Sequence, residues 1–208
     1  MIPVAAWDPI DSMRRTIAID LDGVIYNLLQ GLSDHLMQAH RVKLDPESVT
    51  QYSLAGLTGN EVVDRDIIDR IRDPRFYANL PAYPDAHDAL YALKAAGFCV
   101  VAVTRRPPAA QQATLLALGR DFPDVFSQVY TTKYKLRKLR AIRAQYGIED
   151  HGDTAVEFAR DRIWTYLIAR PYNRGVPESR FLKRVEGVGA AAKYILTPLS
   201  ERLEAHSA

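Results

Sequence analysis

Two aspartates stand two residues apart at the end of an apolar run near the start of the chain. The segment 16–27 reads TIAIDLDGVIYN, so Asp20 directly follows three apolar residues and Asp22 stands two positions later. Residues i and i+2 of a strand point to the same side, so both carboxylates can face one site. A calcium loop is excluded, because its fifth position would be the apolar Val24 and its glycine would come too early, at Gly23. A buried strand that ends in two acids is instead typical of the ligand-binding edge of an open α/β sheet.

Further polar residues follow the ends of later apolar runs. Thr104 ends the run FCVVAVT, and the pair Glu149 and Asp150 ends a short fourth run. A lysine, Lys133 or Lys135, stands at the start of a basic helix. In a parallel sheet these ends gather on one edge. Carboxylates from two strands suit Mg²⁺, and a hydroxyl and a lysine beside them suit phosphate oxygens.

The elements between these residues alternate in type. Apolar strands are predicted near 16–19, 98–103, 125–132 and 163–168, with amphipathic helices between them. The helices include one over 28–40 and one that Pro107 and Pro108 open and Gly119 ends. This alternation predicts an α/β fold built on a doubly wound parallel sheet. The carboxyl ends of its strands would position the residues named above.

Residues 30–83 differ in character from the rest of the chain. They carry more charge, contain only short helical pieces and lack a long apolar strand. We therefore expect a small helical cap inserted after the first strand. The expected division is an N-terminal arm (1–15), an α/β core (16–29 and 84–208) and the cap (30–83).

The composition is that of an ordinary globular protein, with 48% hydrophobic and 25% charged residues among 208. The net charge of +2 indicates neither a nucleic-acid nor a membrane partner. No stretch reaches the roughly 18 apolar residues of a membrane span, and no signal peptide is recognisable. The single cysteine, Cys99, permits no disulfide within the chain, which fits the reducing cytoplasm. A start at Met13, just before the first strand, is an alternative to Met1.

Two groups of basic residues have more than one interpretation. The helix predicted over 133–146 has an apolar side, and its charges would mostly form a solvated face, so we do not expect nucleic-acid binding. Arg105 and Arg106 follow Thr104 and either meet a substrate anion or face water.

This ordered set of residues resembles the haloacid dehalogenase superfamily of phosphohydrolases. Its four motifs match IAIDLDGV, VAVTRRP, the lysine near TTKYK, and GIEDHGD. The segments FYANLPAYPDAHDALYALKAAGFCVVAVT and LIARPYN further resemble the 5′(3′)-deoxyribonucleotidase-like branch. Two features depart from that branch, which usually has two aspartates at Glu149 and Asp150 and an acid followed by an aromatic residue at Tyr26 and Asn27. The resemblance implies a Rossmann-like core and a helical cap.

The resemblance also implies a Mg²⁺-dependent phosphomonoester hydrolase that forms an aspartyl-phosphate. Asp20 would be the nucleophile, and Asp22 would protonate the leaving oxygen and then activate water. The expected phosphate-binding residues are Thr104, Arg105 and either Lys133 or Lys135, with Lys133 preferred because it directly follows the third strand. The expected metal ligands are Asp20, Asp22 through its carbonyl, Glu149 and Asp150.

The resemblance implies a small phosphomonoester as the substrate, and the narrower resemblance favours a deoxynucleoside or nucleoside 5′-monophosphate. Tyr52, Phe76 and Tyr77 of the cap could stack on a base or simply pack the cap. A non-catalytic phosphoester-binding module is an alternative, as is a phosphatase or phosphotransferase for another small phosphorylated metabolite. The oligomeric state is open.

Overall fold

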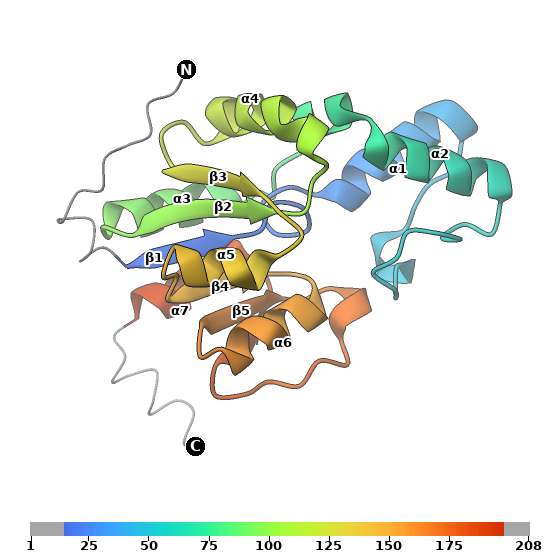
Figure 1. Cartoon of the computed structure of the whole chain (residues 1–208). Helices are drawn as coiled ribbons and strands as arrows, with labels where there is room; N and C mark the ends of the chain where they lie inside the picture. Colours follow the sequence, from blue (N-terminus) through green and yellow to red (C-terminus); the bar gives the residue numbers. More distant parts are fainter. Residues whose placement is uncertain (1–14, 198–208) are drawn as a thin grey trace.

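A six-stranded sheet forms the centre of the protein in a computed structural model that describes residues 15–197 (Figure 1). The strands are β1 (Thr16–Ile19), β2 (Cys99–Thr104), β3 (Gln128–Thr131), β4 (Tyr146–Glu149), β5 (Trp164–Ile168) and β6 (Leu182–Val185). All pair in parallel, in the order β3-β2-β1-β4-β5-β6. The predicted doubly wound parallel sheet is therefore confirmed. The expected arm before Arg15 and the alternative start at Met13 lie outside the described residues.

The sheet is buried on both faces because its central strands are apolar on both sides. In β1, Ile17 and Ile19 share one core with residues of α3 (Ala86–Ala95) and α7 (Val188–Leu196). Ala18, which points the other way, shares a second core with residues of α5 (Lys135–Ala141) and α6 (Gly152–Arg160). In Figure 1, α5 and α6 accordingly lie in front of the sheet, and α3 and α7 lie behind it. This sandwich fixes the strand ends on which the polar residues stand.

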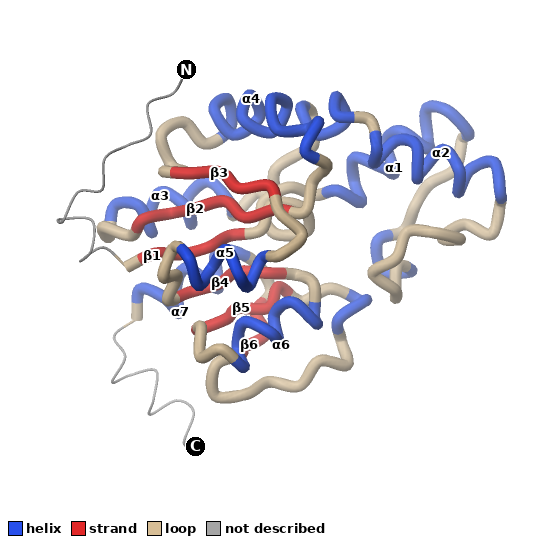
Figure 2. The backbone as a smooth tube through the Cα atoms, viewed as in Figure 1, coloured by secondary structure: helices blue, strands red, loops and turns tan. Residues whose placement is uncertain are grey.

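The chain between β1 and α3 forms a helical segment, residues 28–83, that lies beyond the carboxyl ends of the strands (Figure 2). Its elements are α1 (Leu28–His40), the 3₁₀ turns η2 (Pro46–Ser48) and η3 (Pro74–Ala78), and α2 (Glu61–Arg72) between them. The helix predicted over 28–40 is confirmed with these bounds. Asn27 caps its start by accepting a hydrogen bond from Gln30 N at 3.0 Å, and Arg41 ends it with φ of 60°.

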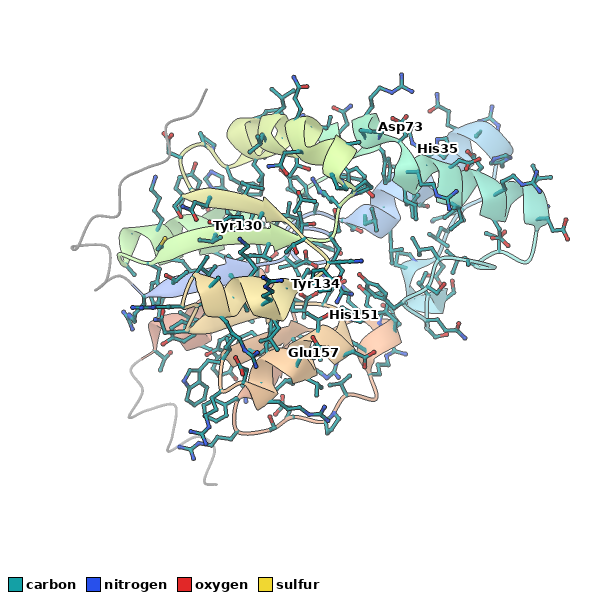
Figure 3. All side chains as sticks on the ribbon, viewed as in Figure 1. His35, Asp73, Tyr130, Tyr134, His151 and Glu157 are labelled. Atoms are coloured by element: carbon teal, nitrogen blue, oxygen red, sulfur yellow. The ribbon has the colours of Figure 1, made fainter. Side chains whose placement is uncertain are left out.

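A shared carboxylate joins α1 to α2. The Nε2 atoms of His35 and His40 lie 2.8 and 2.7 Å from the same oxygen of Asp66, and Figure 3 labels His35 on α1. Burial alone would raise the pKa of Asp66, but the hydrogen bonds from the two histidines outweigh burial and lower it. Leu36 and Ile67 are fully buried between the same helices and the rest of the core.

Three sequence predictions on the core need correction. The helix α4 (Gln111–Asp121) runs past Gly119, which was expected to end it. The basic helix predicted over 133–146 is only α5, because Arg143 takes φ of 52° and the chain enters β4 at Tyr146. The edge strand β6 was not predicted. The remaining elements are the 3₁₀ turns η4 (Pro108–Ala110) and η5 (Pro171–Asn173).

Within residues 15–197, no helix is both long and apolar enough to cross a membrane.

Candidate active site

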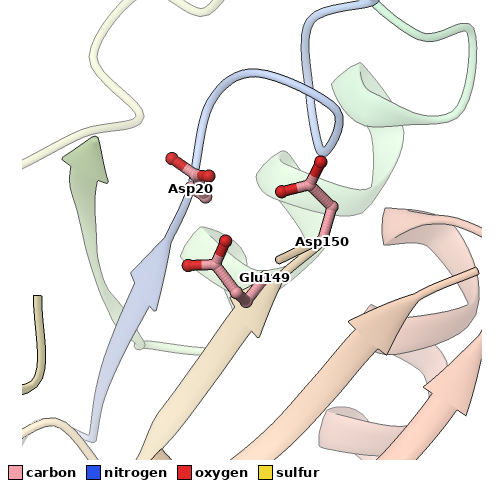
Figure 4. A group of neighbouring side chains, drawn as sticks. All are labelled: Asp20, Glu149 and Asp150. Atoms are coloured by element: carbon pink, nitrogen blue, oxygen red, sulfur yellow. The ribbon is translucent and has the colours of Figure 1, made fainter. Parts of the chain in front are cut away.

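Three carboxylates converge where β1 and β4 end. Asp20 follows β1, and Glu149 and Asp150 close the neighbouring β4 (Figure 4). One oxygen from each lies within 4.8 Å of the others, and the three residues are 6%, 1% and 3% exposed. We call this group the acid cluster. It confirms the expectation that the parallel strands bring these acids to one edge.

Lys135 neutralises part of the acid cluster. Its buried Nζ lies 2.8 Å from an oxygen of Asp20 and donates to Glu149 at 2.8 Å. Burial opposes the charge of Lys135, but the two carboxylates outweigh it and raise its pKa. Burial raises the pKa of Asp20 to about 6; Lys135 opposes this rise and Glu149 adds to it.

The preference for Lys133 does not match its position. Lys133 is exposed, and its Nζ lies 5.0 Å from the ring centre of Tyr134. The turn before α5 explains the difference: Thr132 Oγ1 accepts a hydrogen bond from Tyr134 N at 3.1 Å, so the helix begins two residues later, at Lys135. Lys135 was also expected on the solvated face of the basic helix, and that expectation is wrong as well.

The carboxylate of Asp150 is held in one orientation by the loop after β5. The hydroxyl of Tyr172 donates to Oδ2 of Asp150, and Asn173 Nδ2 donates to its backbone carbonyl at 2.7 Å. Gly23, with φ of +78°, lies so close that a Cβ there would collide with the same carboxylate. Burial, with the negative charges of Asp20 and Glu149, raises the pKa of Asp150 well above its ordinary value.

These residues fit a divalent cation. The other oxygen of Asp150, Oδ1, is buried and has no hydrogen-bond partner among the described residues. A buried polar atom without a partner is costly, and a cation shared with Asp20 would satisfy it. All donors in the cluster are carboxylate oxygens, which hard cations such as Mg²⁺ and Ca²⁺ prefer. The side chain of Asp22 lies outside the cluster, and the expected metal contact of its carbonyl stays a prediction.

Asp22 is instead paired with Arg106. The guanidinium donates through Nε and Nη2 to the two oxygens of Asp22, at 2.9 and 2.7 Å. The Arg106 side chain is 0% exposed and also donates to Thr114 Oγ1 at 3.2 Å. Burial alone would lower its pKa, but Asp22 raises it. Arg106 thus neither faces water nor stands free for a substrate, which were the two alternatives from the sequence.

The other predicted phosphate-binding residues lie around the same opening. Thr104 is buried, and its Oγ1 accepts from Arg106 N at 3.2 Å. Arg105 is exposed and donates to Thr154 Oγ1 at 2.8 Å. Arg170, which the sequence interpretation missed, donates to the carbonyl of Gly23 at 2.7 Å. The segment LIARPYN, which contains Arg170, was noted from the sequence, but this arginine was given no role.

A cavity of about 360 Å³ joins this site to the helical segment. Residues of both parts line it, which agrees with the position of the segment beyond the strand ends. Its volume is at the small end of the range for ligand pockets. From the strand ends and following loops it is lined by Asp20, Asp22, Gly23, Thr104, Arg105, Arg106, Asp150, Arg170 and Tyr172.

The geometry agrees with a comparison of the chain with known families. The family of haloacid dehalogenase-like hydrolases matches residues 14–156, which span β1 to α6 and include every carboxylate of the site. The chain therefore belongs to the haloacid dehalogenase-like hydrolases. Among curated protein sequences, no significant match was found.

Solved structures of this superfamily share the fold. L-2-haloacid dehalogenase from Xanthobacter autotrophicus, with chloropropionic acid covalently bound, has 15% identity and a TM-score of 0.59, covering 88% of this chain and 98% of its own. D,D-heptose 1,7-bisphosphate phosphatase from Burkholderia thailandensis has 16% identity and a TM-score of 0.53, covering 89% and 100%. CbbY from Rhodobacter sphaeroides, in complex with xylulose-(1,5)bisphosphate, has 12% identity and a TM-score of 0.54, covering 85% and 96%. Identities this low establish the fold alone.

Proposed function

We propose that the protein is a Mg²⁺-dependent phosphomonoester hydrolase that works through an aspartyl-phosphate. One observation carries the proposal: the Asp150 carboxylate, with one buried oxygen that has no partner among the described residues, clusters with Asp20, which also contacts the buried Lys135. This arrangement suits a carboxylate nucleophile that must approach an anionic phosphoryl group.

In the proposed reaction, an oxygen of Asp20 attacks phosphorus and the bond to the ester oxygen breaks. Asp22 gives a proton to the departing alkoxide, so that an alcohol leaves. Asp22 then takes a proton from water, which attacks the aspartyl-phosphate and releases phosphate and the Asp20 carboxylate. When bound, Mg²⁺ would offset the negative charge that the two anions bring together.

The remaining residues would position these groups. Lys135 holds one oxygen of Asp20 and brings positive charge toward the phosphoryl oxygens. Thr104 and Arg105 line the cavity where those oxygens would lie. Arg106 fixes the direction of Asp22, and a carboxylate bound in this way keeps lone pairs for a further contact.

A dehalogenase function fits these residues less well, although haloacid dehalogenases share the fold. A halide leaves as a stable anion and needs no proton, whereas an alkoxide does. In the proposed reaction Asp22, which lines the cavity, would supply that proton. A non-catalytic binding module would likewise need no acid–base residue, although Asp22 would still pair with Arg106 in it.

We also propose that residues 30–83 act as a cap that excludes water from the site. The Tyr52 ring lies 4.1 Å from that of His151, centre to centre, and His151 is labelled at the start of α6 in Figure 3. Glu47 pairs with Arg174 at 2.7 Å. These contacts support a cap that closes against the core.

The narrower proposals concern substrate and location. Nucleoside 5′-monophosphates remain a proposed substrate class, supported by Tyr52 and Tyr77 in the cavity lining. Phe76 gives no support, because it is buried and does not line the cavity. We propose a cytoplasmic location on the basis of the single Cys99.

The test is phosphate release from a panel of phosphomonoesters with Mg²⁺ or with a chelator. We expect release only with Mg²⁺, and none from Asp20→Asn protein of unchanged circular dichroism. Asp88→Asn is the matched control, because the Asp88 side chain is 99% exposed and contacts His87 rather than the acid cluster. Transfer of phosphate to added alcohols, followed in the same assay, separates a phosphotransferase. Undiminished turnover by Asp20→Asn protein would refute the covalent mechanism.

A further inference from the structure

The cavity has two chemically different walls. Charged and polar side chains of the strand ends and following loops line one wall. The other wall comes from the helical segment and contains Leu29, Val49, Leu54, Ile68 and Ile71. Among the described residues that line the cavity, this segment supplies no charged side chain.

Most polar side chains on the second wall either have a hydrogen-bond or ring partner already or are exposed. The hydroxyl of Tyr77 donates to the carbonyl of Ile71 at 2.7 Å, so it is already satisfied. Tyr52 is 46% exposed, and its ring packs against His151 and Tyr172 at centre distances of 4.1 and 5.7 Å. Ser53 is exposed. This wall therefore offers mainly ring faces and aliphatic carbon, and its further polar side-chain groups are the hydroxyls of Tyr52, Ser53 and Tyr83.

These walls imply an orientation for a bound ester. The phosphate requires the charged wall, because its oxygens need donors and cations. The group esterified to it must then lie against the apolar wall. A polyhydroxylated group would lose hydrogen bonds to water there without replacing them, whereas an apolar group gains by leaving water.

We propose that the substrate's leaving group is an apolar, ring-bearing alcohol that packs against Leu29, Leu54 and Ile68. This inference rests on the proposed phosphomonoesterase function and names its substrate class. The reaction is unchanged: the phosphorus–oxygen bond breaks, the alcohol leaves with a proton from Asp22, and water completes the phosphate. The ring can belong to a simple apolar alcohol or to a nucleoside whose base lies flat against the same wall.

The experiment compares kcat/KM for three esters of primary alcohols, so that the acidity of the leaving group is similar. They are 2-phenylethyl phosphate, thymidine 5′-monophosphate and glucose 6-phosphate. We expect 2-phenylethyl phosphate to exceed glucose 6-phosphate by about tenfold or more, the smallest effect usual for apolar recognition in a pocket. A similar advantage for thymidine 5′-monophosphate identifies a nucleoside as the source of the ring, and its absence identifies an apolar alcohol.

A pair of variants on α2 tests the wall itself. Ile68→Thr keeps the branch at Cβ but removes one carbon and introduces a hydroxyl, and it should lower kcat/KM for 2-phenylethyl phosphate more than for ethyl phosphate. Val62→Thr is the matched control, because Val62 is 69% exposed on the same helix and does not line the cavity. It should change neither value.

Three results would have distinct meanings. Glucose 6-phosphate turned over as well as 2-phenylethyl phosphate would overturn the inference while leaving the phosphatase function intact. An advantage for thymidine 5′-monophosphate alone would also overturn it, because recognition would then depend on the polar groups of the nucleoside. No release from any ester with Mg²⁺ present would instead contradict the proposed function.

Discussion

The pair formed by Asp22 and Arg106 predicts that a change at the proposed acid–base residue also destabilises the fold. In the Asp22→Leu variant, the contacts left to the buried guanidinium among the described residues would be Thr114 Oγ1 and the ring faces of Tyr26 and Tyr77, whose centres lie 5.1 and 4.8 Å away. Removing one partner of a buried ion pair costs roughly 3–5 kcal/mol, because the remaining charge is left without compensation. Asp22 is 19% exposed and the rings retain some attraction, so we expect the lower end, about 3 kcal/mol.

Urea denaturation measures this change. A loss of about 3 kcal/mol should lower the urea concentration at the unfolding midpoint without changing the slope of the free energy against urea. The unfolding temperature should fall by about 6–12 °C for a chain of this length. Asp22→Asn keeps the shape and one acceptor and should lose less. The double variant Asp22→Leu with Arg106→Leu should recover most of the stability, because an apolar pair replaces the whole ion pair.

The chain contains a matched control on its surface. Arg140 makes the same two-bond contact with Asp161, at 2.9 and 2.6 Å, but its side chain is 61% exposed. Asp161→Leu should therefore cost no more than about 1 kcal/mol. The reasoning is refuted if Asp22→Leu is as stable as the wild type, or if the double variant loses as much as the two single variants together.

Three further predictions concern other parts of the site and the helical segment. Gly23→Ala should displace the acid cluster and abolish the rise in unfolding temperature on adding Mg²⁺, whereas Gly56→Ala, which shares a positive φ but has open space, should retain that rise. Lys135→Met should lower kcat by about 10²–10³-fold while Lys133→Met stays near the wild type in a phosphate-release assay; the opposite ranking would move the role to Lys133. Because the pKa of Asp66 is lowered in the folded state, its contribution to stability is present at neutral pH and lost as the pH falls through that pKa. Asp66→Asn should thus be less stable than the wild type at pH 7 in thermal unfolding, with the difference fading in acid, and a difference that grows in acid would contradict this.

The sequence predicted the parts of the site that depend on local pattern. The apolar lead-in to Asp20 and the run before Glu149 and Asp150 define buried strands, and parallel order then brings their ends together. The helix over 28–40 was predicted with its bounds because residues such as Leu28, Leu32 and Leu36 recur at helical spacing. These features need no knowledge of distant contacts.

The parts that were missed depend on contacts between distant residues or on a short local turn. Arg106 lies 84 residues from Asp22 along the chain, so no local pattern reveals that they pair. The choice between Lys133 and Lys135 depended on two residues at the helix start. The strand β6, with sequence LKRV, has only four residues and carries charge at the sheet edge, which is how edge strands avoid pairing with other chains but also hides their strand pattern.

The last loop of the core explains why a segment noted only by resemblance belongs to the site. Asn173 is 2% exposed and donates to the carbonyls of Asp150 and Ile168, which ties the end of β4 to the end of β5. Tyr172 then bonds one oxygen of Asp150, and the other oxygen is buried without a hydrogen-bond partner among the described residues. Residues that orient a ligand carboxylate in this way commonly matter for metal affinity nearly as much as the ligand itself. The PYN segment therefore acts on the proposed chemistry indirectly: it sets the direction of Asp150, and through it the position a cation would take beside Asp20.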